Sequence, residues 1–162
     1  MRNPLSTVAR RLGTRPWLMR HADLIVRLDR RLYALSGGRF GLVALAGLPS
    51  VRLRTTGRRS GLARATNLLC LPRAGELVLV GSNWGRRHDP GWTHNLRANP
   101  TATVWRGRRV LPVRAREAEG AEYDRLWREL LEFWPGYEME RQIAGRRLPI
   151  FILTISPGCQ QV

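Results

Sequence analysis

A short basic turn is the first stretch of the chain whose residue types could bind a ligand. The sequence TTGRRSG, residues 55–61, combines two glycines with two adjacent arginines, and no acidic residue lies near it. Successive backbone N–H groups in a glycine-rich turn form a concave anion site, and paired guanidinium groups add bidentate contacts to phosphate or carboxylate. The stretch therefore predicts an anion-binding turn, with a solvated hairpin tip as the alternative.

A second candidate site lies in GSNWGRRHDPGWTHNLRANP, residues 81–100. A serine, an asparagine and a tryptophan follow an expected strand, and a proline, a tryptophan and an asparagine belong to the expected helix after it: Ser82, Asn83, Trp84, Pro90, Trp92 and Asn95. Flat aromatic rings beside amide groups suit a planar heterocyclic ligand. The alternative is that both tryptophans fill the protein core.

The other combinations of reactive residues do not form a catalytic pattern. His21, His88 and His94 have no spacing that would make two of them metal ligands, so no metal site is expected. No Ser-His-acid or Cys-His arrangement stands out, and the Rossmann and Walker glycine motifs are missing from the sequence. If the chain is an enzyme, a bound cofactor therefore supplies the reactive group.

Strands joined by short turns must position both candidate sites. Period-two alternation after residue 50 predicts strands at 51–55, 62–71, 77–82, 101–106, 108–118 and 149–155. Short connections require antiparallel neighbours, and several such strands tend to close into a small barrel. Apolar residues at three- and four-residue steps predict helices, at 17–36, 91–99 and 119–133. The expected fold class is α+β, with a basic flexible arm at 1–16 and a single domain at 17–162.

The charge of the chain is strongly positive and unevenly distributed. All 28 basic residues are arginine, against 12 acidic residues, and the net charge is +16. The excess lies in the first half of the chain, where a polyanion or an anionic membrane surface would be attracted. Arginines without interleaved aromatic residues or a groove-reading motif do not indicate a nucleic-acid partner.

The helix expected at 17–36 is amphipathic, and charges interrupt its apolar residues every few positions. This excludes a spanning segment or a signal-peptide core. The helix either packs on the body of the domain or lies on anionic lipid. Cys70 and Cys159 have no partner at metal-ligand spacing, and free thiols are typical of the cytosol. The expected location is the cytoplasm. A further expectation is peripheral contact with the inner face of the membrane.

Four stretches together resemble the deazaflavin-dependent nitroreductase and quinone reductase family: LRTTGRRSG, GSNWG with DPGWTHNLRANPTATV, FWPGYE and RRLPIFILT. They run from about Leu32 to Thr154 in the order and spacing of that family. The resemblance implies an antiparallel split β-barrel, similar to the flavin-binding pyridoxamine oxidases. It also implies coenzyme F-420, a deazaflavin with a phosphate and an oligoglutamate tail, with FMN as the alternative cofactor. In such proteins the reduced cofactor gives a hydride to quinones, and in some members to nitroaromatic compounds.

The resemblance also implies roles for individual residues. The anionic tail would lie on the turn and on one nearby arginine: Thr56, Gly57, Arg58, Arg59, Ser60, Gly61 and Arg64. The deazaflavin ring would lie against the second stretch: Ser82, Asn83, Trp84, Pro90, Gly91, Trp92 and Asn95. Ser82 and Tyr137 are the candidate catalytic residues, with Tyr137 as a substrate-side hydrogen-bond or proton donor. In the family members that activate nitroimidazoles, the corresponding segment is rich in tyrosine. In this chain it holds Trp134, Tyr137 and Glu140 instead.

The function that these features predict is transfer of a hydride from reduced F-420 to a quinone, a nitroaromatic compound or a similar small acceptor. A non-catalytic split barrel that binds a flavin, a deazaflavin or another anion is the alternative. The expected partners are the electron acceptor, an anionic membrane surface at the N-terminal helix, and a second copy of the chain in a homodimer.

Overall fold

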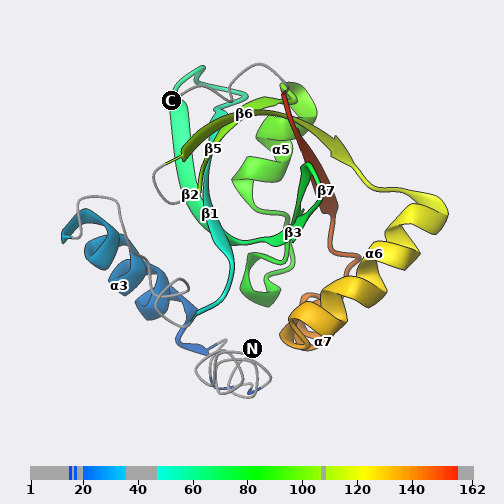
Figure 1. Cartoon of the computed structure of the whole chain (residues 1–162). Helices are drawn as coiled ribbons and strands as arrows, with labels where there is room; N and C mark the ends of the chain where they lie inside the picture. Colours follow the sequence, from blue (N-terminus) through cyan, green and yellow to red (C-terminus); the bar gives the residue numbers. More distant parts are fainter. Residues whose placement is uncertain (1–14, 16, 18–19, 36–46, 107–108, 157–162) are drawn as a thin grey trace.

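A curled antiparallel sheet forms the body of the molecule (Figure 1). The computed structural model describes residues 15, 17, 20–35, 47–106 and 109–156. The strands are β1 (Ser50–Thr56), β2 (Ala63–Leu69), β3 (Leu71–Arg73), β4 (Glu76–Val80), β5 (Thr101–Arg106), β6 (Arg109–Glu117) and β7 (Ile150–Ile155). They pair in the order β2-β1-β5-β6-β7-β4-β3, and each pairing is antiparallel. The predicted antiparallel split barrel is confirmed.

The strand predicted at 62–71 is divided in the structure. At the break, Cys70 donates its backbone N–H to the carbonyl of Pro49 at 3.0 Å. β2 pairs with β1 before this point, whereas β3 pairs with β4 after it. The two edge strands of the sheet are therefore consecutive in the chain, and the bend at Cys70 brings the two open edges of the barrel together.

β4 and β7 are buried on both faces because helices lie on each side of them. On the inner face, Leu79 and Phe151 belong to one core cluster with residues of α5 (Gly91–Ala98). On the outer face, Val78 and Ile152 belong to a second cluster with residues of α6 (Gly120–Phe133) and α7 (Gly136–Ala144). The apolar runs ELVLV and IFIL are typical of strands that are covered on both faces.

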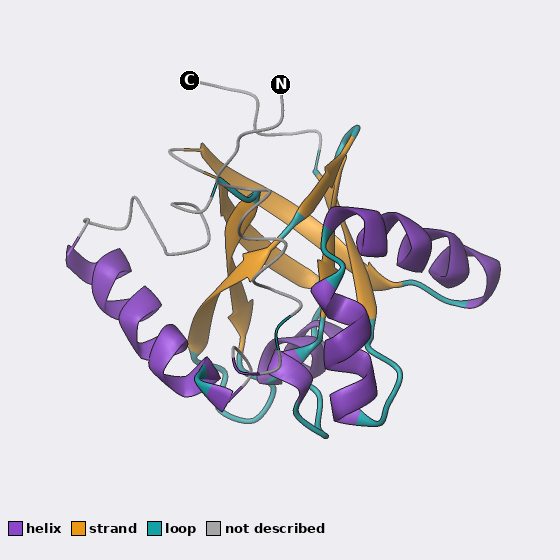
Figure 2. Ribbon diagram, turned by 90° about the horizontal axis from the view of Figure 1, so that it is seen from below, coloured by secondary structure: helices purple, strands orange, loops and turns teal. Residues whose placement is uncertain are grey.

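The helices differ in what they cover. α5 lies within the ring that the strands make in Figure 1, whereas α3 (Ala22–Leu35) lies on the side of the sheet away from α6 (Figures 1 and 2). Asn67 of β2 donates to the carboxylate of Asp29 at 2.8 Å and so ties α3 to the barrel. The predicted arm at 1–16 falls outside the described residues, apart from Arg15. In the described part of the chain, no helix is both long and apolar enough to cross a bilayer.

α7 is the main element that the sequence prediction missed. It begins after Pro135 and ends at Gly145, which has a left-handed φ of 61° and donates its N–H to the carbonyl of Arg141 at 3.0 Å. A proline at the start and a glycine just past the end are usual helix boundaries. The short 3-10 helix η1 (Asn83–Gly85) was also not predicted, whereas the helices expected at 91–99 and 119–133 agree with α5 and α6 within one residue.

Candidate functional site

The turn between β1 and β2 has the geometry of an anion site. Gly57 donates its N–H to the carbonyl of Leu62 at 2.8 Å, and Gly61 donates to the carbonyl of Gly57 at 2.7 Å. Gly61 has a φ of 66°, in the left-handed region that favours glycine. A side chain on Gly57 would place its Cβ 2.8 Å from the hydroxyl of Ser60. Both glycines are therefore needed to close the turn.

Two adjacent backbone N–H groups in this turn are available to a ligand. Those of Arg59 and Ser60 donate to no acceptor in the part of the chain that the structure describes. The side chains of Arg58 and Arg59 are exposed, and no carboxylate of a described residue pairs with either. Arg64 lies beside them, since its Cγ is 3.7 Å from the Cβ position of Gly57. Unpaired donors and positive charges gathered at one turn favour a bound anion.

Asn95 of α5 connects the turn to the second candidate stretch. Its Oδ1 accepts the backbone N–H of Arg58 at 3.0 Å, and its Nδ2 donates to the hydroxyl of Thr55 at 3.0 Å. The Asn95 side chain is only 8% exposed. The structure therefore brings the two candidate segments together, and it uses Asn95 to hold the turn rather than to face an open pocket.

The loop after β4 has an unusual backbone. Asn83, Trp84 and Gly85 have φ values of 51°, 57° and 73°, so three consecutive residues are left-handed. This conformation costs about 1 kcal/mol or more for each residue other than glycine, and such strain tends to lie at functional sites. Gly85 packs directly on α7, because a Cβ there would meet Cγ2 of Ile143 at 3.2 Å. The side chains of Asn83 and Trp84 are partly exposed.

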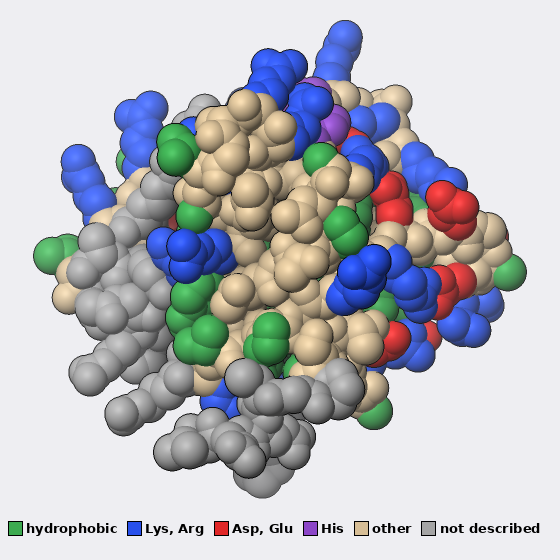
Figure 3. Space-filling model, turned by 90° about the horizontal axis from the view of Figure 1, so that it is seen from above, with side chains coloured by type: hydrophobic (Ala, Val, Ile, Leu, Met, Phe, Trp, Pro, Cys, Tyr) green, Lys and Arg blue, Asp and Glu red, His purple; other side chains and the backbone are tan. Residues whose placement is uncertain are grey.

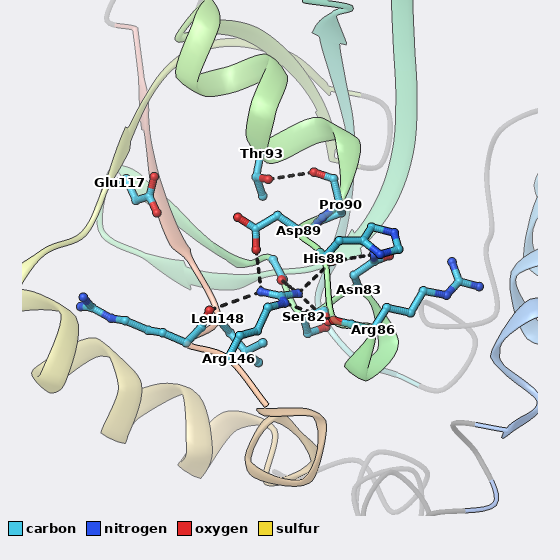
Figure 4. A network of polar contacts seen from close by, with 12 residues as sticks. Ser82, Asn83, Arg86, His88, Asp89, Pro90, Thr93, Glu117, Arg146 and Leu148 are labelled. Carbon is cyan, nitrogen blue, oxygen red and sulfur yellow. Dashed lines mark hydrogen bonds and ion pairs between the residues drawn. The ribbon is translucent and has the colours of Figure 1, made fainter. Parts of the chain in front are cut away.

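Arg146 holds this loop in place, as the close view of Figure 4 shows. Its guanidinium group donates to the backbone carbonyls of Gly81, Arg86 and His88 at 3.0, 3.1 and 3.2 Å, and to that of Ser82 at 3.3 Å. It also forms an ion pair of 2.6 Å with a carboxylate oxygen of the same loop, Oδ1 of Asp89. One planar cation thus binds four backbone carbonyls on the two sides of the left-handed residues, of which that of Ser82 also accepts the N–H of Gly85 at 3.1 Å.

Asp89 joins the loop to the rest of the barrel. Its second oxygen accepts from Arg97 of α5 at 2.9 Å, and Arg97 binds both carboxylate oxygens of Glu117 at 2.7 and 2.8 Å. These hydrogen bonds, first of all those to Glu117, raise the pKa of Arg97. A continuous series of ion pairs therefore fixes the loop relative to α5 and β6, and it is formed by Arg146, Asp89, Arg97 and Glu117. Sequence reasoning missed Arg146, since nothing in GRRLP separates it from Arg147.

The predicted ring-pocket residues divide into two groups. Ser82, Asn83, Trp84, Pro90 and Gly91 are at least partly exposed and can contact a ligand. Trp92 and Asn95 are buried, with Trp92 packed edge-on against Phe151 at 5.4 Å between ring centroids. For Trp92, the expectation of a core position therefore agrees with the structure, and any effect on a ligand would act through packing.

The predicted catalytic residue Tyr137 lies in α7 and is only 4% exposed. Burial, and then the nearby Glu140 carboxyl, raise the pKa of its phenol well above the usual value. The hydroxyl therefore stays protonated at neutral pH and can act only as a hydrogen-bond donor or acceptor there. Ser82, the other predicted catalytic residue, is partly exposed at the start of the loop that Arg146 holds.

Two surface concavities are lined in part by this network, through Asp89 and Arg97 in one and Arg146 in the other. They have volumes of about 450 and 550 Å³, share Tyr123 and Arg147 in their linings, and lie beside α6 and α7. Neither includes the turn at 57–61. In Figure 3, arginines stand around the rim of the face shown, and the carboxylates gather on one side of it. The candidate site lies at the turn at 57–61, where the available N–H donors are, and at the adjoining loop after β4.

Comparison with known proteins gives a consistent result. A family model described as F420H(2)-dependent quinone reductase matches residues 25–155. An F420H(2)-dependent quinone reductase of Mycobacterium tuberculosis is 31% identical over 142 residues, which cover 85% of this chain and 95% of the relative. The solved structure of an F420-H2 dependent reductase, FDR-A, is 37% identical with a TM-score of 0.60, and covers 65% of this chain and 93% of its own. A second structure, described as a domain-swapped dimer, is 32% identical with a TM-score of 0.62 over 82% of this chain and 98% of its own.

Proposed function

The chain belongs to the F420H(2)-dependent quinone reductase family, and on that premise we propose that it is an oxidoreductase that reduces quinones with reduced coenzyme F420. The observation that carries the proposal is the turn at 57–61, where unpaired arginines and available N–H groups meet. The residues fit the cofactor, because its phosphate and tail are anionic and the turn offers only donors and positive charge.

Coenzyme F420, when bound, supplies the hydride. The protein residues have to bind it, orient it and exclude water. The N–H groups of Arg59 and Ser60 would hold the phosphate, and Arg58, Arg59 and Arg64 would neutralise the tail. Thr56, Gly57 and Gly61 complete the turn. Asn95 keeps this turn at a fixed position relative to α5, so binding at the turn sets where the rest of the cofactor lies.

The reactive end of the cofactor would lie against the loop after β4. Ser82, Asn83, Trp84, Pro90 and Gly91 supply the exposed contacts, and Trp92 supports them from the core. The hydrogen bonds and the ion pair of Arg146 keep the loop in one conformation. Binding of the cofactor therefore loses no conformational entropy in ordering the loop. Tyr137 is proposed as a hydrogen-bond donor on the substrate side, a role that suits its raised pKa.

The cofactor site can be tested by changing Arg58 and Arg59 to alanine together. Charge-assisted hydrogen bonds contribute about 1.5–3 kcal/mol each, so oxidised F420 should bind at least ~10-fold more weakly by calorimetric titration. The matched control is Arg125→Ala with Arg128→Ala, which removes the same charge from the exposed face of α6. Unchanged affinity in the folded Arg58 and Arg59 double variant would contradict the assignment.

The same preparation distinguishes an enzyme from a binding protein. A reductase oxidises F420H2 in the presence of a water-soluble quinone, and the absorbance of the oxidised deazaflavin appears with time. A non-catalytic carrier would bind the cofactor and show no turnover with any quinone. Parallel assays with nitroaromatic compounds decide whether the acceptor range extends to them.

We propose further that the protein is cytoplasmic and contacts an anionic membrane through α3. Leu24, Leu28 and Leu35 are spaced by four and seven residues, so they lie on one face of α3, and each is between 43% and 85% exposed. Trp17, which precedes α3, is 50% exposed. Arg31, seven residues after Leu24, lies on this same face, and Arg27 of α3 and Arg20 before it are also exposed. Exposed leucines together with arginines suit an anionic lipid surface, and quinones with long apolar chains are dissolved in lipid.

The membrane proposal can be tested by sedimentation with anionic phospholipid vesicles at low salt. Changing Arg20, Arg27 and Arg31 to glutamine should reduce binding by ~100-fold, since each arginine near such a surface contributes about 1 kcal/mol. The Arg125 and Arg128 variant again serves as the control. If the wild-type protein does not sediment but elutes as a dimer, a second copy of the chain covers this face instead.

A further inference from the structure

The segment after α7 repeats the Gly-Arg-Arg sequence of the turn at 57–61, and the proposed function gives its second arginine no role. Residues 145–147 have this sequence, as residues 57–59 do. Gly145 is left-handed, with a φ of 61°, and so is Gly61 in the turn, with a φ of 66°. The same three residue types also occur at 85–87, so the sequence alone does not identify a site. The contacts around residues 145–147 have to decide it.

Two adjacent backbone N–H groups are available in this segment. The N–H of Gly145 still serves the helix, because it donates to the carbonyls of Arg141 and Gln142 at 3.0 and 3.3 Å. The N–H groups of Arg146 and Arg147, which follow it, donate to no acceptor among the residues that the structure describes. The turn at 57–61 offers the same kind of donor pair. Adjacent N–H groups beside a left-handed residue are a usual backbone element of anion sites.

The side chain of Arg147 adds an unneutralised positive charge. It is exposed, and no carboxylate in the described ranges pairs with it. Its guanidinium carbon lies 3.6 Å from the centre of the Tyr123 ring, and the Tyr123 hydroxyl is fixed in turn by donating to the carbonyl of Leu148 at 3.0 Å. Stacking occupies a face of the guanidinium group, whereas its N–H donors lie in the plane of the group. Arg147 is therefore held in position without a carboxylate partner.

These groups line the larger of the two concavities described above. Its volume of about 550 Å³ lies in the range of sites for small organic ligands. The lining contains three arginines and no acidic residue: Tyr123, Arg141, Gln142, Gly145, Arg146 and Arg147. The neighbouring concavity of about 450 Å³ includes three carboxylates in its lining, those of Asp89, Glu117 and Glu119. Only the larger concavity therefore has a lining that favours an anion.

The three arginines of the lining do not contribute equally. Arg141 lies over the ring of Trp127 at 4.9 Å and pairs with Glu138 at 2.8 Å. The guanidinium group of Arg146 is committed to the loop after β4 and to Asp89. Because both of these charges have carboxylate partners, the net positive charge of the lining is that of Arg147. Arg146 can contribute its backbone N–H without releasing the loop.

We propose that the concavity at the end of α7 is a second anion site, which binds a small molecule through a phosphate group. The N–H groups of Arg146 and Arg147 and the guanidinium group of Arg147 would bind the phosphate oxygens. A phosphate monoester carries close to two negative charges at neutral pH and has several acceptor oxygens, which suits two adjacent N–H donors beside an arginine. The site shares no residue with the turn at 57–61, so the inference does not depend on which cofactor that turn binds.

The site can be tested by calorimetric titration with phenyl phosphate at constant ionic strength. The Arg58→Ala and Arg59→Ala double variant is the starting protein, because the turn at 57–61 would also attract the probe. This variant should still bind one equivalent of phenyl phosphate. Adding Arg147→Gln should weaken binding at least ~10-fold, since it removes charge-assisted hydrogen bonds. Adding Arg125→Gln instead is the matched control, because it removes one exposed arginine of α6 that lines neither concavity, and it should leave the affinity unchanged.

A second measurement needs no change at Arg147. In nitrogen–proton NMR spectra of the Arg58 and Arg59 double variant, the backbone amide signals of Arg146 and Arg147 should shift as phenyl phosphate is added. Absence of binding to this variant would overturn the proposal, and so would saturable binding that leaves these two signals in place. An equal loss of affinity with Arg125→Gln and with Arg147→Gln would also overturn it, since that would indicate general attraction to a basic protein.

Discussion

Replacing Arg146 by glutamine should destabilise the protein by an amount that its contacts allow us to estimate. The guanidinium group donates to four loop carbonyls and to Asp89, and its side chain is 16% exposed. Breaking a fully buried ion pair costs about 3–5 kcal/mol. The value here should lie at the lower end, because Asp89 keeps a second partner in Arg97 and water can reach part of the loop.

We therefore expect a loss of about 3 kcal/mol in the free energy of unfolding. For a chain of this size, that corresponds to a fall in Tm of roughly 6–12 °C. Urea denaturation, followed by tryptophan fluorescence, should show a lower midpoint with an unchanged slope, because the surface exposed on unfolding stays the same.

Arg147→Gln is the control at the next position in the chain. Arg147 is exposed and stacks on the ring of Tyr123 at 3.6 Å, a contact that contributes about 0.5–1 kcal/mol at an exposed site. A loss for Arg146→Gln no greater than that for Arg147→Gln would refute the view that Arg146 holds the loop. Affinity for F420, measured in the same two variants, should fall only for Arg146→Gln.

Three further changes test other parts of the structure. Gly81→Ala should cost about 1–3 kcal/mol, because its Cβ would lie 2.7 Å from Cγ of Pro149, whereas Gly91→Ala meets nothing within 4 Å and should be neutral or stabilising in thermal unfolding. Asn95→Ala leaves the N–H of Arg58 without its acceptor and should cost about 1–3 kcal/mol, with weaker F420 binding by titration. Since the pKa of Glu140 is raised in the fold, the stability that its neutral form provides is fully present below about pH 4.5 and is lost as the pH rises to about 7. The loss should amount to roughly 3 kcal/mol, and a wild-type unfolding profile parallel to that of Glu140→Gln across this range would contradict it.

The strands could be predicted because their side-chain patterns are local. The alternation in β1 and the apolar runs of β4 and β7 follow directly from which faces are covered. The division at Cys70 could not be predicted, because a chain that leaves one partner strand for another keeps its extended backbone and its alternating pattern. α7 is short, and its proline and glycine boundaries are equally typical of a loop.

The candidate site was predictable in its position and less so in its internal connections. The composition of residues 55–61 indicates an anion site, since two glycines and two arginines are readable without a structure. The roles of Asn95 and Arg146 depend on contacts with residues 37 and up to 65 positions away. Arg146 holds a loop, whereas Arg147 stacks on the ring of Tyr123. The sequence does not distinguish these two roles, because they depend on the fold.

The position of β7 in the sheet has a consequence for synthesis on the ribosome. This strand, formed by residues 150–155, lies between β6 and β4 in the sheet and pairs with both. Until residues 150–155 leave the exit tunnel, β4 presents its run of leucines and valines with an unpaired edge, a state prone to pairing with other chains. The barrel therefore closes only after β7 has been translated, and the edge of β4 is exposed to such pairing during that interval.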